Sequence, residues 1–305
     1  MEMVLNLRDV EVFHAVMMTG GVGRAAGLLE TSQPTVSRTI AKLETTCGFR
    51  LFDRVRGRLT PTREGQLLFA EVKANLVGLD RLKQTAVRIR ELGDGVIRVA
   101  SLAALGHGIV PRAIARFSRA HPNVSISYQV RTSSVVRDLI ATGRFDVGLA
   151  ADEVNVIGVD HTVFATPRAV CVVPKQHRLA GKKQILPRDL DGEPLIALAP
   201  EDTARRAMDA AFTKAGITPK VVIETPYSLT VAALVQNGAG VGLVNPYALE
   251  GFDTSELSIR AFEPAIYFRA LLLRPPGAPT SMVVSAFIKA LYQEQKAVRA
   301  RRQGG

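Results

Sequence analysis

The chain has 305 residues, of which 47% are hydrophobic and 22% charged, and its formal net charge is +11. This length suits two or three domains, and the composition excludes an intrinsically disordered chain. The two cysteines, Cys47 and Cys171, lie far apart without CxxC spacing, so the sequence suggests neither a disulfide framework nor a zinc site. The positive charge favours an anionic partner such as nucleic acid.

Apolar segments and the distribution of charge along the chain bear on the cellular location of the protein. The first residues include early acidic side chains and no basic-then-apolar run, and no uninterrupted apolar segment reaches about 18 residues. We therefore expect a cytoplasmic protein without a membrane partner. Residues 1–65 carry nine Lys/Arg against seven Asp/Glu, so the basic excess lies elsewhere. We expect the basic C-terminal end, with Lys296, Arg299, Arg301 and Arg302, to be a solvated tail.

Three short helices are predicted at the N-terminus. Apolar residues at helical spacing predict a first helix from Leu7 that ends at Gly20-Gly21, and a second helix over residues 23–29. Ser32 suits the N-cap of a third helix, and Pro34 suits its first turn. The third helix buries one stripe of residues, Val36, Ile40 and Leu43.

The opposite face of this third helix predicts contact with duplex DNA. It gathers short or forked polar groups at its N-terminal end, where a recognition helix meets base edges. We expect Gln33, Thr35 and Arg38 to contact bases, and the neighbouring residues to position the helix. The full set is Ser32, Gln33, Pro34, Thr35, Ser37 and Arg38. The alternative is an ordinary solvated face.

A short basic hairpin follows. Arg54, Arg56 and Arg58 alternate around Gly57, and such spacing can put guanidinium groups on one side to reach phosphates or a minor groove. This predicts a wing, and the alternative is a solvated hairpin tip.

A long helix is predicted over residues 64–92, which contain no proline. Spacings of four and three alternate along it and define a coiled-coil seam that predicts a homodimer. The seam is Leu68, Val72, Asn75, Leu79, Leu82, Ala86 and Ile89. The alternative is a single helix packed on its own domain.

The first 65 residues resemble LysR-type transcriptional regulators. The resemblance lies in Ala25-Ala26, in the run from Thr31 to Arg38, in Leu51-Phe52-Asp53-Arg54 and in the run from Leu59 to Gly65. It implies an N-terminal all-α winged helix-turn-helix with a dimerising linker helix. It also implies a two-lobed α/β effector domain like the periplasmic binding proteins, and assembly as a homotetramer.

Four further stretches resemble the branch of this family that activates a lysine-biosynthesis gene. These are residues 13–17, 54–59, 78–81 and 241–246. The opine-catabolism branch shares the first stretch and some of the others. The effector that the resemblance implies is diaminopimelate, with an opine or another amino-acid derivative as the alternative, and RNA polymerase is a possible partner. No dense acidic cluster is visible in the sequence to match two ammonium groups.

The remainder of the chain alternates short β-rich runs with helical stretches, which predicts parallel α/β units. We expect strands over 96–100, 124–130, 145–150, 169–173, 195–199, 221–224, 241–244 and 265–273. We expect helices over 108–120, 134–142, 203–215, 228–237 and 280–293. The expected domains are 1–63, 64–92 and 93–305. Lobe I takes 93–165 and 268–305, lobe II takes 166–267, and the crossings lie near Thr166 and Phe268.

The expected ligand site lies beyond the carboxyl ends of the strands, where helix N-termini offer free N–H groups. The candidate effector contacts are Ser101, Ala103, Thr132, Ser133, Thr203, Ser228, Thr230 and Asn245. Asp152 and Asn245 could accept hydrogen bonds from ammonium groups. Each of these residues alone is more often a cap or a turn residue.

Two other protein classes fit the sequence less well. An enzyme lacks support because no GxSxG or GxxxxGK[ST] occurs and the five histidines have no metal-ligand spacing. The sequence therefore predicts no catalytic residue, no metal and no cofactor. A solute-binding protein would share the two lobes, but it would be exported and would lack the DNA-binding front.

Overall fold

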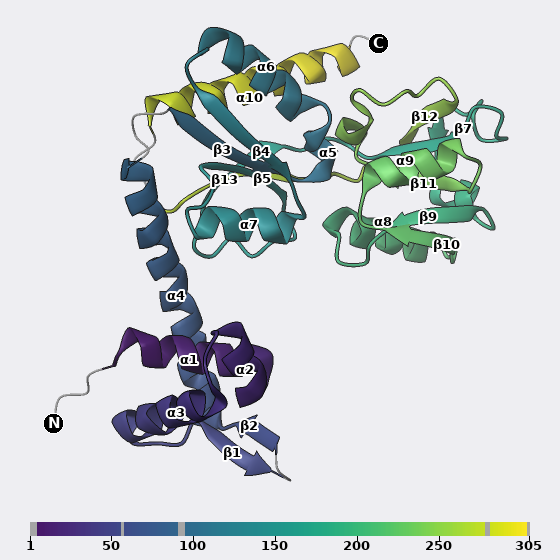
Figure 1. The fold of residues 1–305 in the computed structure, drawn as a ribbon. Helices are drawn as coiled ribbons and strands as arrows, with labels where there is room; N and C mark the ends of the chain where they lie inside the picture. Colours follow the sequence, from purple (N-terminus) through teal and green to yellow (C-terminus); the bar gives the residue numbers. More distant parts are fainter. Residues whose placement is uncertain (1–4, 56–57, 91–94, 278–280, 304–305) are drawn as a thin grey trace. The chain divides into compact units, whose positions relative to one another are not determined.

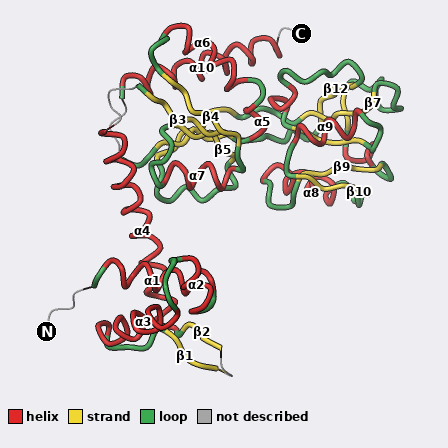
Figure 2. Tube along the Cα trace, viewed as in Figure 1, coloured by secondary structure: helices red, strands yellow, loops and turns green. Residues whose placement is uncertain are grey.

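The computed structural model describes residues 5–55, 58–90, 95–277 and 281–303, and they form two compact units, Met1–Lys83 and Gln84–Gly305. The first unit is mainly helical and the second is α/β (Figures 1 and 2). No helix among the described residues is both long and apolar enough to cross a membrane.

The first unit packs three helices and a hairpin around one core. Its elements are α1 (Leu7–Thr19), α2 (Val22–Leu28), α3 (Gln33–Cys47), β1 (Phe52–Val55), β2 (Arg58–Pro61) and the start of α4 (Arg63–Arg90). Phe13 lies at the centre with no exposed surface, and its ring meets the edges of Phe52 and Phe69. The predicted winged helix-turn-helix is therefore confirmed as a fold.

Helix α4 belongs partly to this core. Leu68 and Val72, the first two positions of the predicted seam, pack against the first unit, as does Leu76. Leu82 is 68% exposed, and the Asn75 amide donates to the Glu71 carbonyl one turn earlier. The seam therefore starts inside the domain and only its later part is available to a partner. The side chains of Leu79, Ala86 and Ile89 lie outside the described part of the helix.

The second unit contains two sheets, one in each lobe. The lobe I sheet has the order β4-β3-β5-β13-β6, and the lobe II sheet has the order β10-β9-β11-β7-β12-β8. Lobe I uses β3 (Val96–Ser101), β4 (Ser125–Val130), β5 (Val147–Ala151), β6 (Asp160–Ala165) and β13 (Ala270–Arg274). Lobe II uses β7 (Val170–Pro174), β8 (Gln184–Ile185), β9 (Pro194–Leu198), β10 (Lys220–Thr225), β11 (Val241–Val244) and β12 (Leu257–Phe262).

Helices cover both sheets in the way that parallel strands require. They are α5 (Ala103–Gly106), α6 (Ile109–Ala120), α7 (Ser133–Ala141), α8 (Thr203–Lys214), α9 (Ser228–Gln236), α10 (Met282–Gln303) and the 3-10 turns η1 (Pro187–Leu190) and η2 (Pro246–Leu249). Central strands β3, β9 and β11 each pair with a parallel neighbour, as the alternation of β and helical runs predicted.

The two chain crossings between the lobes lie side by side. Ala169 donates to the Ile266 carbonyl at 2.7 Å, and Phe268 donates to the Pro167 carbonyl at 2.9 Å. The expected crossings near Thr166 and Phe268 are therefore the segments that join the lobes. A second tie is η2, because Tyr247 is buried in the lobe I core and Glu250 bonds Arg112 of α6 at 2.9 Å.

Two predicted elements were wrong in extent. The expected strand over 265–273 is shorter, because residues before Ala270 form a lobe crossing instead of a sheet strand. The expected helix over 280–293 continues to Gln303. The prediction of a solvated C-terminal tail is therefore wrong for the residues up to Gln303, which are helical. Val298 has no exposed surface and extends the apolar stripe of Phe287 and Leu291. Strands β6, β8 and β12 were not predicted.

Candidate DNA-binding and effector sites

The start of α3 is built as the sequence predicted. The Ser32 hydroxyl accepts a hydrogen bond from the Thr35 N–H at 3.3 Å and lies 2.8 Å from the Thr35 hydroxyl. Pro34 occupies the first turn, where no N–H is needed. The six predicted recognition residues, Ser32, Gln33, Pro34, Thr35, Ser37 and Arg38, are all exposed.

An ion pair and close packing fix α3 against its neighbours. Asp9 of α1 is 8% exposed and accepts from the Lys42 ammonium group of α3 at 2.8 Å. A Cβ atom on Gly23 of α2 would lie 3.2 Å from the Gln33 amide, so Gly23 leaves room for that side chain. The exposed face of α3 is therefore held on a rigid support.

Glu44 joins α3 to the wing. One oxygen of its carboxylate accepts hydrogen bonds from the N–H groups of Leu51 and Phe52, at 2.7 and 3.1 Å. On the other side of the same segment, Thr62 donates to the Arg50 and Leu51 carbonyls. Glu44 was not predicted from the sequence, because no periodicity or motif reveals which backbone groups a half-buried carboxylate will accept from.

The wing itself is an antiparallel hairpin in which Arg54 pairs with Leu59, and Arg58 with Val55. Paired positions share a face and neighbouring positions alternate, so positions 54 and 58 belong to opposite faces. The register thus places these two backbone positions on opposite faces, and the side chains of Arg54 and Arg58 lie outside the described part of the hairpin. Arg56 lies outside the described residues.

Two serines play equivalent roles in the two lobes. In lobe I, the Ser133 hydroxyl at the start of α7 accepts from the N–H of Ala151, the last residue of β5, at 3.0 Å. In lobe II, the Ser228 hydroxyl at the start of α9 accepts from the N–H of Asn245, which follows β11, at 3.1 Å. Each serine thus ties a helix start to the end of a strand.

The other candidate effector contacts differ in how accessible they are. Thr132 and Thr230 are exposed, and Ala103 opens the short helix α5. Ser101 has no exposed surface, and its hydroxyl lies 2.7 Å from that of Tyr128. This position does not suit a direct ligand contact, because the side chain is already covered and hydrogen-bonded.

Asn245 is also largely committed within the fold. It is 4% exposed, and its amide oxygen accepts from the Tyr247 N–H at 3.0 Å. It therefore caps η2, and its side-chain oxygen is not free to take an ammonium group.

The start of α8 differs most from expectation. Asp202 is the N-cap, and one of its oxygens accepts from the N–H groups of Ala204 and Arg205, at 2.7 and 3.0 Å. The Thr203 hydroxyl instead accepts from Arg206. Because the Asp202 carboxylate already takes two N–H groups of this helix start and adds a negative charge there, the start of α8 suits an anionic ligand less than the sequence predicted.

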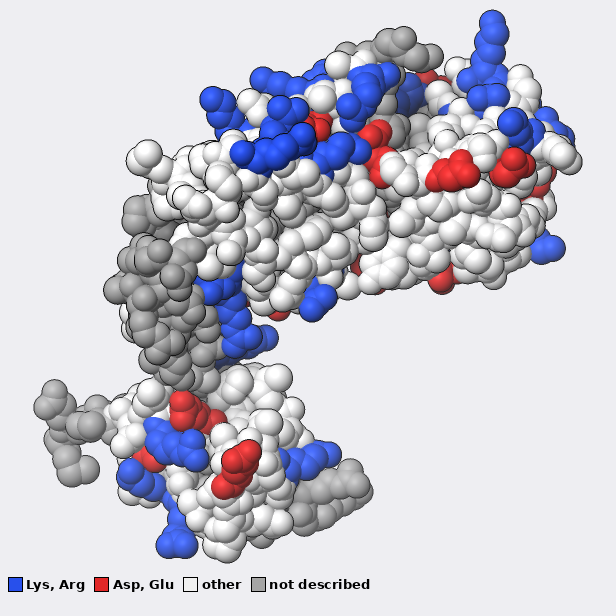
Figure 3. Space-filling model, turned by 45° about the horizontal axis from the view of Figure 1, so that its top comes forward, with Lys and Arg blue, Asp and Glu red and all other residues white. Residues whose placement is uncertain are grey.

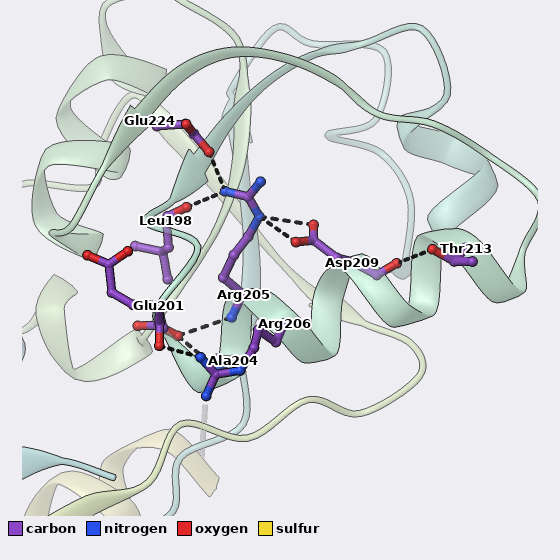
Figure 4. Close-up of polar contacts among 9 residues, drawn as sticks. Leu198, Glu201, Ala204, Arg205, Arg206, Asp209, Thr213 and Glu224 are labelled. Carbon is purple, nitrogen blue, oxygen red and sulfur yellow. Dashed lines mark hydrogen bonds and ion pairs between the residues drawn. The ribbon is translucent and has the colours of Figure 1, made fainter. Parts of the chain in front are cut away.

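Arg205 fixes the orientation of this helix start (Figure 4). Its guanidinium group donates to the Leu198 carbonyl at the end of β9, to Asp209 and to Glu224. Helix α8 is therefore bonded to the ends of both neighbouring strands, β9 and β10, which holds Asp202 in place.

The pKa values of two carboxyl groups, Asp202 of lobe II and Glu153 of lobe I, are raised at this point, and nearby acidic charges contribute to both rises. Burial raises the pKa of Asp202, and the charge of Asp152, which follows β5 in lobe I, raises it further. Glu153 keeps an exposed part, yet burial of its carboxyl raises its pKa, and Asp202 and Asp152 add to the rise. The N–H bonds to Asp202 and the Ser133 hydroxyl at Glu153 oppose these rises. The fold thus brings these three carboxyl groups within electrostatic reach of one another, which the sequence did not reveal, and we call them the acidic cluster.

Two family models match this chain. "Bacterial regulatory helix-turn-helix protein, lysR family" covers residues 7–66, and "LysR substrate binding domain" covers residues 90–296. This chain belongs to the LysR family. The LysR-type chain is accordingly a DNA-binding transcriptional regulator and not an enzyme.

Individual relatives support the same assignment over nearly the whole length of this chain. The transcriptional activator protein LysR of Escherichia coli (strain K12) is 38% identical over 93% of this chain and 91% of its own length. The octopine catabolism/uptake operon regulatory protein OccR of Rhizobium meliloti is 33% identical over 93% of this chain and 94% of its own.

A solved structure shows the same fold. HinK, a LysR family transcriptional regulator from Pseudomonas aeruginosa, matches with a TM-score of 0.56 at 21% identity, over 95% of this chain and 98% of its own. The predicted fold class, a winged helix-turn-helix followed by a two-lobed α/β domain, is confirmed.

Proposed function

We propose that this LysR-type regulator senses a cationic amino-acid derivative, with diaminopimelate as the first candidate, and activates a lysine-biosynthesis gene. The observation that carries the proposal is the acidic cluster of Asp152, Glu153 and Asp202, which combines side chains from both lobes. An ammonium group placed among these carboxylates would relieve their mutual repulsion. A ligand that pairs with both lobes would also favour their closed arrangement.

The ends of the ligand would meet different groups in this proposal. One ammonium group lies among Asp152, Glu153 and Asp202, and a carboxylate accepts from the N–H groups at the starts of α5, α7 and α9, near Ala103, Thr132 and Ser228. Thr132 and Thr230 carry exposed hydroxyls that can reach a ligand, and the Thr132 hydroxyl lies 3.3 Å from that of Ser134. Ser133 already bonds Ala151 and Glu153, and it positions the Glu153 carboxylate.

The DNA-binding part of the proposal concerns α3 and the wing. Gln33, Thr35 and Arg38 contact base edges, whereas Ser32, Ser37 and the wing arginines hold the phosphate backbone. Homodimers form through the later part of α4 and pair into a homotetramer, and the ligand changes the spacing between dimers. The activated form would then recruit RNA polymerase.

An opine is the second candidate effector. The 33% identity to OccR, named as an octopine catabolism/uptake operon regulator, supports it. An opine and diaminopimelate both carry amino-acid groups, so binding measurements are needed to distinguish them.

We would titrate the full-length protein with diaminopimelate, lysine and octopine by calorimetry. Diaminopimelate is expected to bind saturably, and Asp202→Asn to weaken it roughly 10- to 100-fold, as for loss of one charged hydrogen-bond partner. Asn is as good an N-cap as Asp, so this variant removes the charge and keeps the helix start. Asp191→Asn, an exposed lobe II position, is the control and should bind normally.

The pH dependence gives an independent check. Asp202 and Glu153 have raised pKa values in the free protein, and a bound ammonium group would lower them. Binding then releases protons, so affinity should fall as the pH is lowered from neutral toward the raised pKa values of these two carboxyl groups. If octopine binds and diaminopimelate does not, the lysine-pathway assignment is contradicted, whereas the assignment as a transcriptional regulator is unaffected. Affinity that is independent of pH and of Asp202 would contradict the cationic site.

A further inference from the structure

The net charge of the second unit is concentrated on two helices. The unit carries 27 Lys/Arg and 19 Asp/Glu, a formal charge of +8. Helices α6 and α10 together hold eight of these basic residues and one acidic residue, Glu294, a charge of +7. The rest of the unit is therefore nearly neutral, although it is by far the larger part.

The basic residues lie on adjoining surfaces of these two packed helices. In α6 they occupy positions 112, 116 and 119, one helical stripe. In α10, Lys289, Lys296 and Arg299 follow a second stripe, opposite the buried Phe287, Leu291 and Val298. Figure 3 shows Lys and Arg side chains gathered over α6 and α10. We call this surface the α6–α10 face.

Part of this charge is used inside the fold. Glu294 is 5% exposed and pairs with Arg116 at 2.7 Å and Arg112 at 3.6 Å, which joins α10 to α6. Glu250 pairs with Arg112 at 2.9 Å and Arg301 at 3.6 Å. These pairs leave both carboxylates saturated with cations, so they cannot neutralise further side chains.

The remaining cations are available to a partner. Arg119, Lys289, Lys296 and Arg299 are exposed, and within the described ranges no carboxylate lies at ion-pair distance from any of them. Along α10, Lys289 and Arg299 are ten residues apart, about 15 Å at 1.5 Å per residue. Duplex DNA presents one phosphate charge per roughly 1.7 Å of its axis, so the face spans several phosphates.

We propose that the α6–α10 face of the effector domain binds the phosphate backbone of duplex DNA, outside the segment held by the helix-turn-helix. DNA is favoured over other anions because this chain is already a DNA-binding regulator, so local DNA concentration at the face is high. The face offers stripes of long, unpaired cations, with Gln293 the exposed amide between Lys289 and Lys296, and this excess of charge suits sequence-independent contact with phosphates. It gives the basic C-terminal residues a role in holding flanking DNA.

The test compares two full-length quadruple variants of equal charge. The first replaces Arg119, Lys289, Lys296 and Arg299 with Gln. The matched control replaces Lys175, Lys183, Lys214 and Lys220, exposed lysines of lobe II, with Gln. Binding to random-sequence duplexes of about 20 and about 60 base pairs is measured between about 50 and 200 mM salt, because two half-sites already span about 20 base pairs.

On the long duplex, the salt slope of the first variant should be smaller by about 3 to 4 units per chain, at about 0.9 per phosphate contact. The affinity of the wild type should therefore fall about 100-fold more than that of the variant between the two salt concentrations. Wild type, variant and control should agree on the short duplex. Lys289→Arg and Lys296→Arg should behave as wild type at their positions, because phosphate contact needs charge and not shape.

Several results would overturn the proposal. One is a variant that matches the control on the long duplex. Another is a first variant that binds DNA like the wild type but has lost a different property. That property would be association with anionic phospholipid vesicles, activation of RNA polymerase, or the native oligomeric mass. Each of these would assign the α6–α10 face to a membrane surface, to the polymerase or to a second copy of the chain. Failure of the wild type to bind the short duplex would instead count against the DNA-binding function itself.

Discussion

Arg38 is the residue on which base recognition depends most in our proposal. It is exposed on α3, on the side opposite the buried Val36 and Ile40. Its planar guanidinium group can donate two hydrogen bonds to one guanine, a contact that discriminates between base pairs. The neighbouring Thr35 hydroxyl is already close to Ser32, which makes it the more constrained of the two.

Replacing Arg38 with Ala should weaken binding to the operator by about 1 to 3 kcal/mol and should weaken binding to random-sequence DNA much less. The measurement is the ratio of operator to random-duplex affinity at fixed salt. Arg8→Ala, an exposed arginine of α1 outside the recognition face, serves as the control. An equal loss on both DNAs would show that Arg38 contacts phosphate only.

Asp202 illustrates the limit of residue type as a guide. The hydroxyl of Thr203 suggested a ligand contact at this helix start, whereas the carboxylate one residue earlier takes the N–H groups. An Asp before a helical run is a recognised N-cap signal, so the cap could have been predicted. Its proximity to Asp152, fifty residues earlier, could not.

At the scale of elements, one carboxylate of α3 joins this helix to the wing. The N–H groups of buried Leu51 and Phe52 both donate to Glu44, and among the described strands none lies there to replace it as an acceptor. Glu44 therefore sets the angle at which the hairpin leaves α3. The wing and the recognition helix act on one DNA segment, so their relative placement determines how many contacts form together.

Glu44→Ala should destabilise the first unit by about 1 to 3 kcal/mol, because it leaves buried N–H groups without an acceptor. It should also reduce the salt slope of DNA binding by about 0.9 for each phosphate that the wing no longer reaches. Glu44→Gln keeps an amide oxygen at the same place and should retain most of both properties. Chemical denaturation and salt titration measure the two effects. An Ala variant as stable as wild type would exclude this role.

Helix α10 shows how an apolar stripe outweighs a charged composition. Its last turns hold four arginine or lysine residues, which by themselves suggest a solvated tail. Val298 nevertheless continues the spacing of Phe287 and Leu291, and the buried Glu294 pairs with α6. Packing of one face is enough to keep the helix regular while the other face stays charged.

At the scale of the whole molecule, assembly should depend on the later part of α4. Leu82 leaves most of an apolar side chain exposed on a long helix, at a seam position, whereas Val72 is buried within its own domain. A second copy that covers Leu82 would bury this surface and bring two recognition helices onto a two-fold operator.

Leu82→Glu should therefore weaken dimerisation by at least about tenfold, since a buried apolar contact worth roughly 1.5 to 3 kcal/mol is replaced by a charge. Analytical ultracentrifugation at several concentrations measures the effect. Leu67→Glu, an exposed position of the same helix away from the seam, should leave the assembly unchanged. Dissociation by both variants, or by neither, would place the dimer contact elsewhere.

The sequence by itself determined most of the elements and the family. Local spacing predicted α1, α3, the wing and most strands, because burial of one face imposes a period of 3.6 or 2 on the chain. It also identified Ser32 as a cap, since capping acts between residues three apart. Such features are encoded within one or two turns and need no knowledge of distant segments.

Only the tertiary structure decided which distant groups meet. It brought Asp152 and Glu153 of lobe I to Asp202 of lobe II, bonded Glu44 to the wing, and covered Ser101. It also paired Arg112 and Arg116 of α6 with Glu294 of α10. The physical reason is that electrostatics and burial depend on separation in space, and chain crossings between the lobes make that separation independent of distance along the sequence.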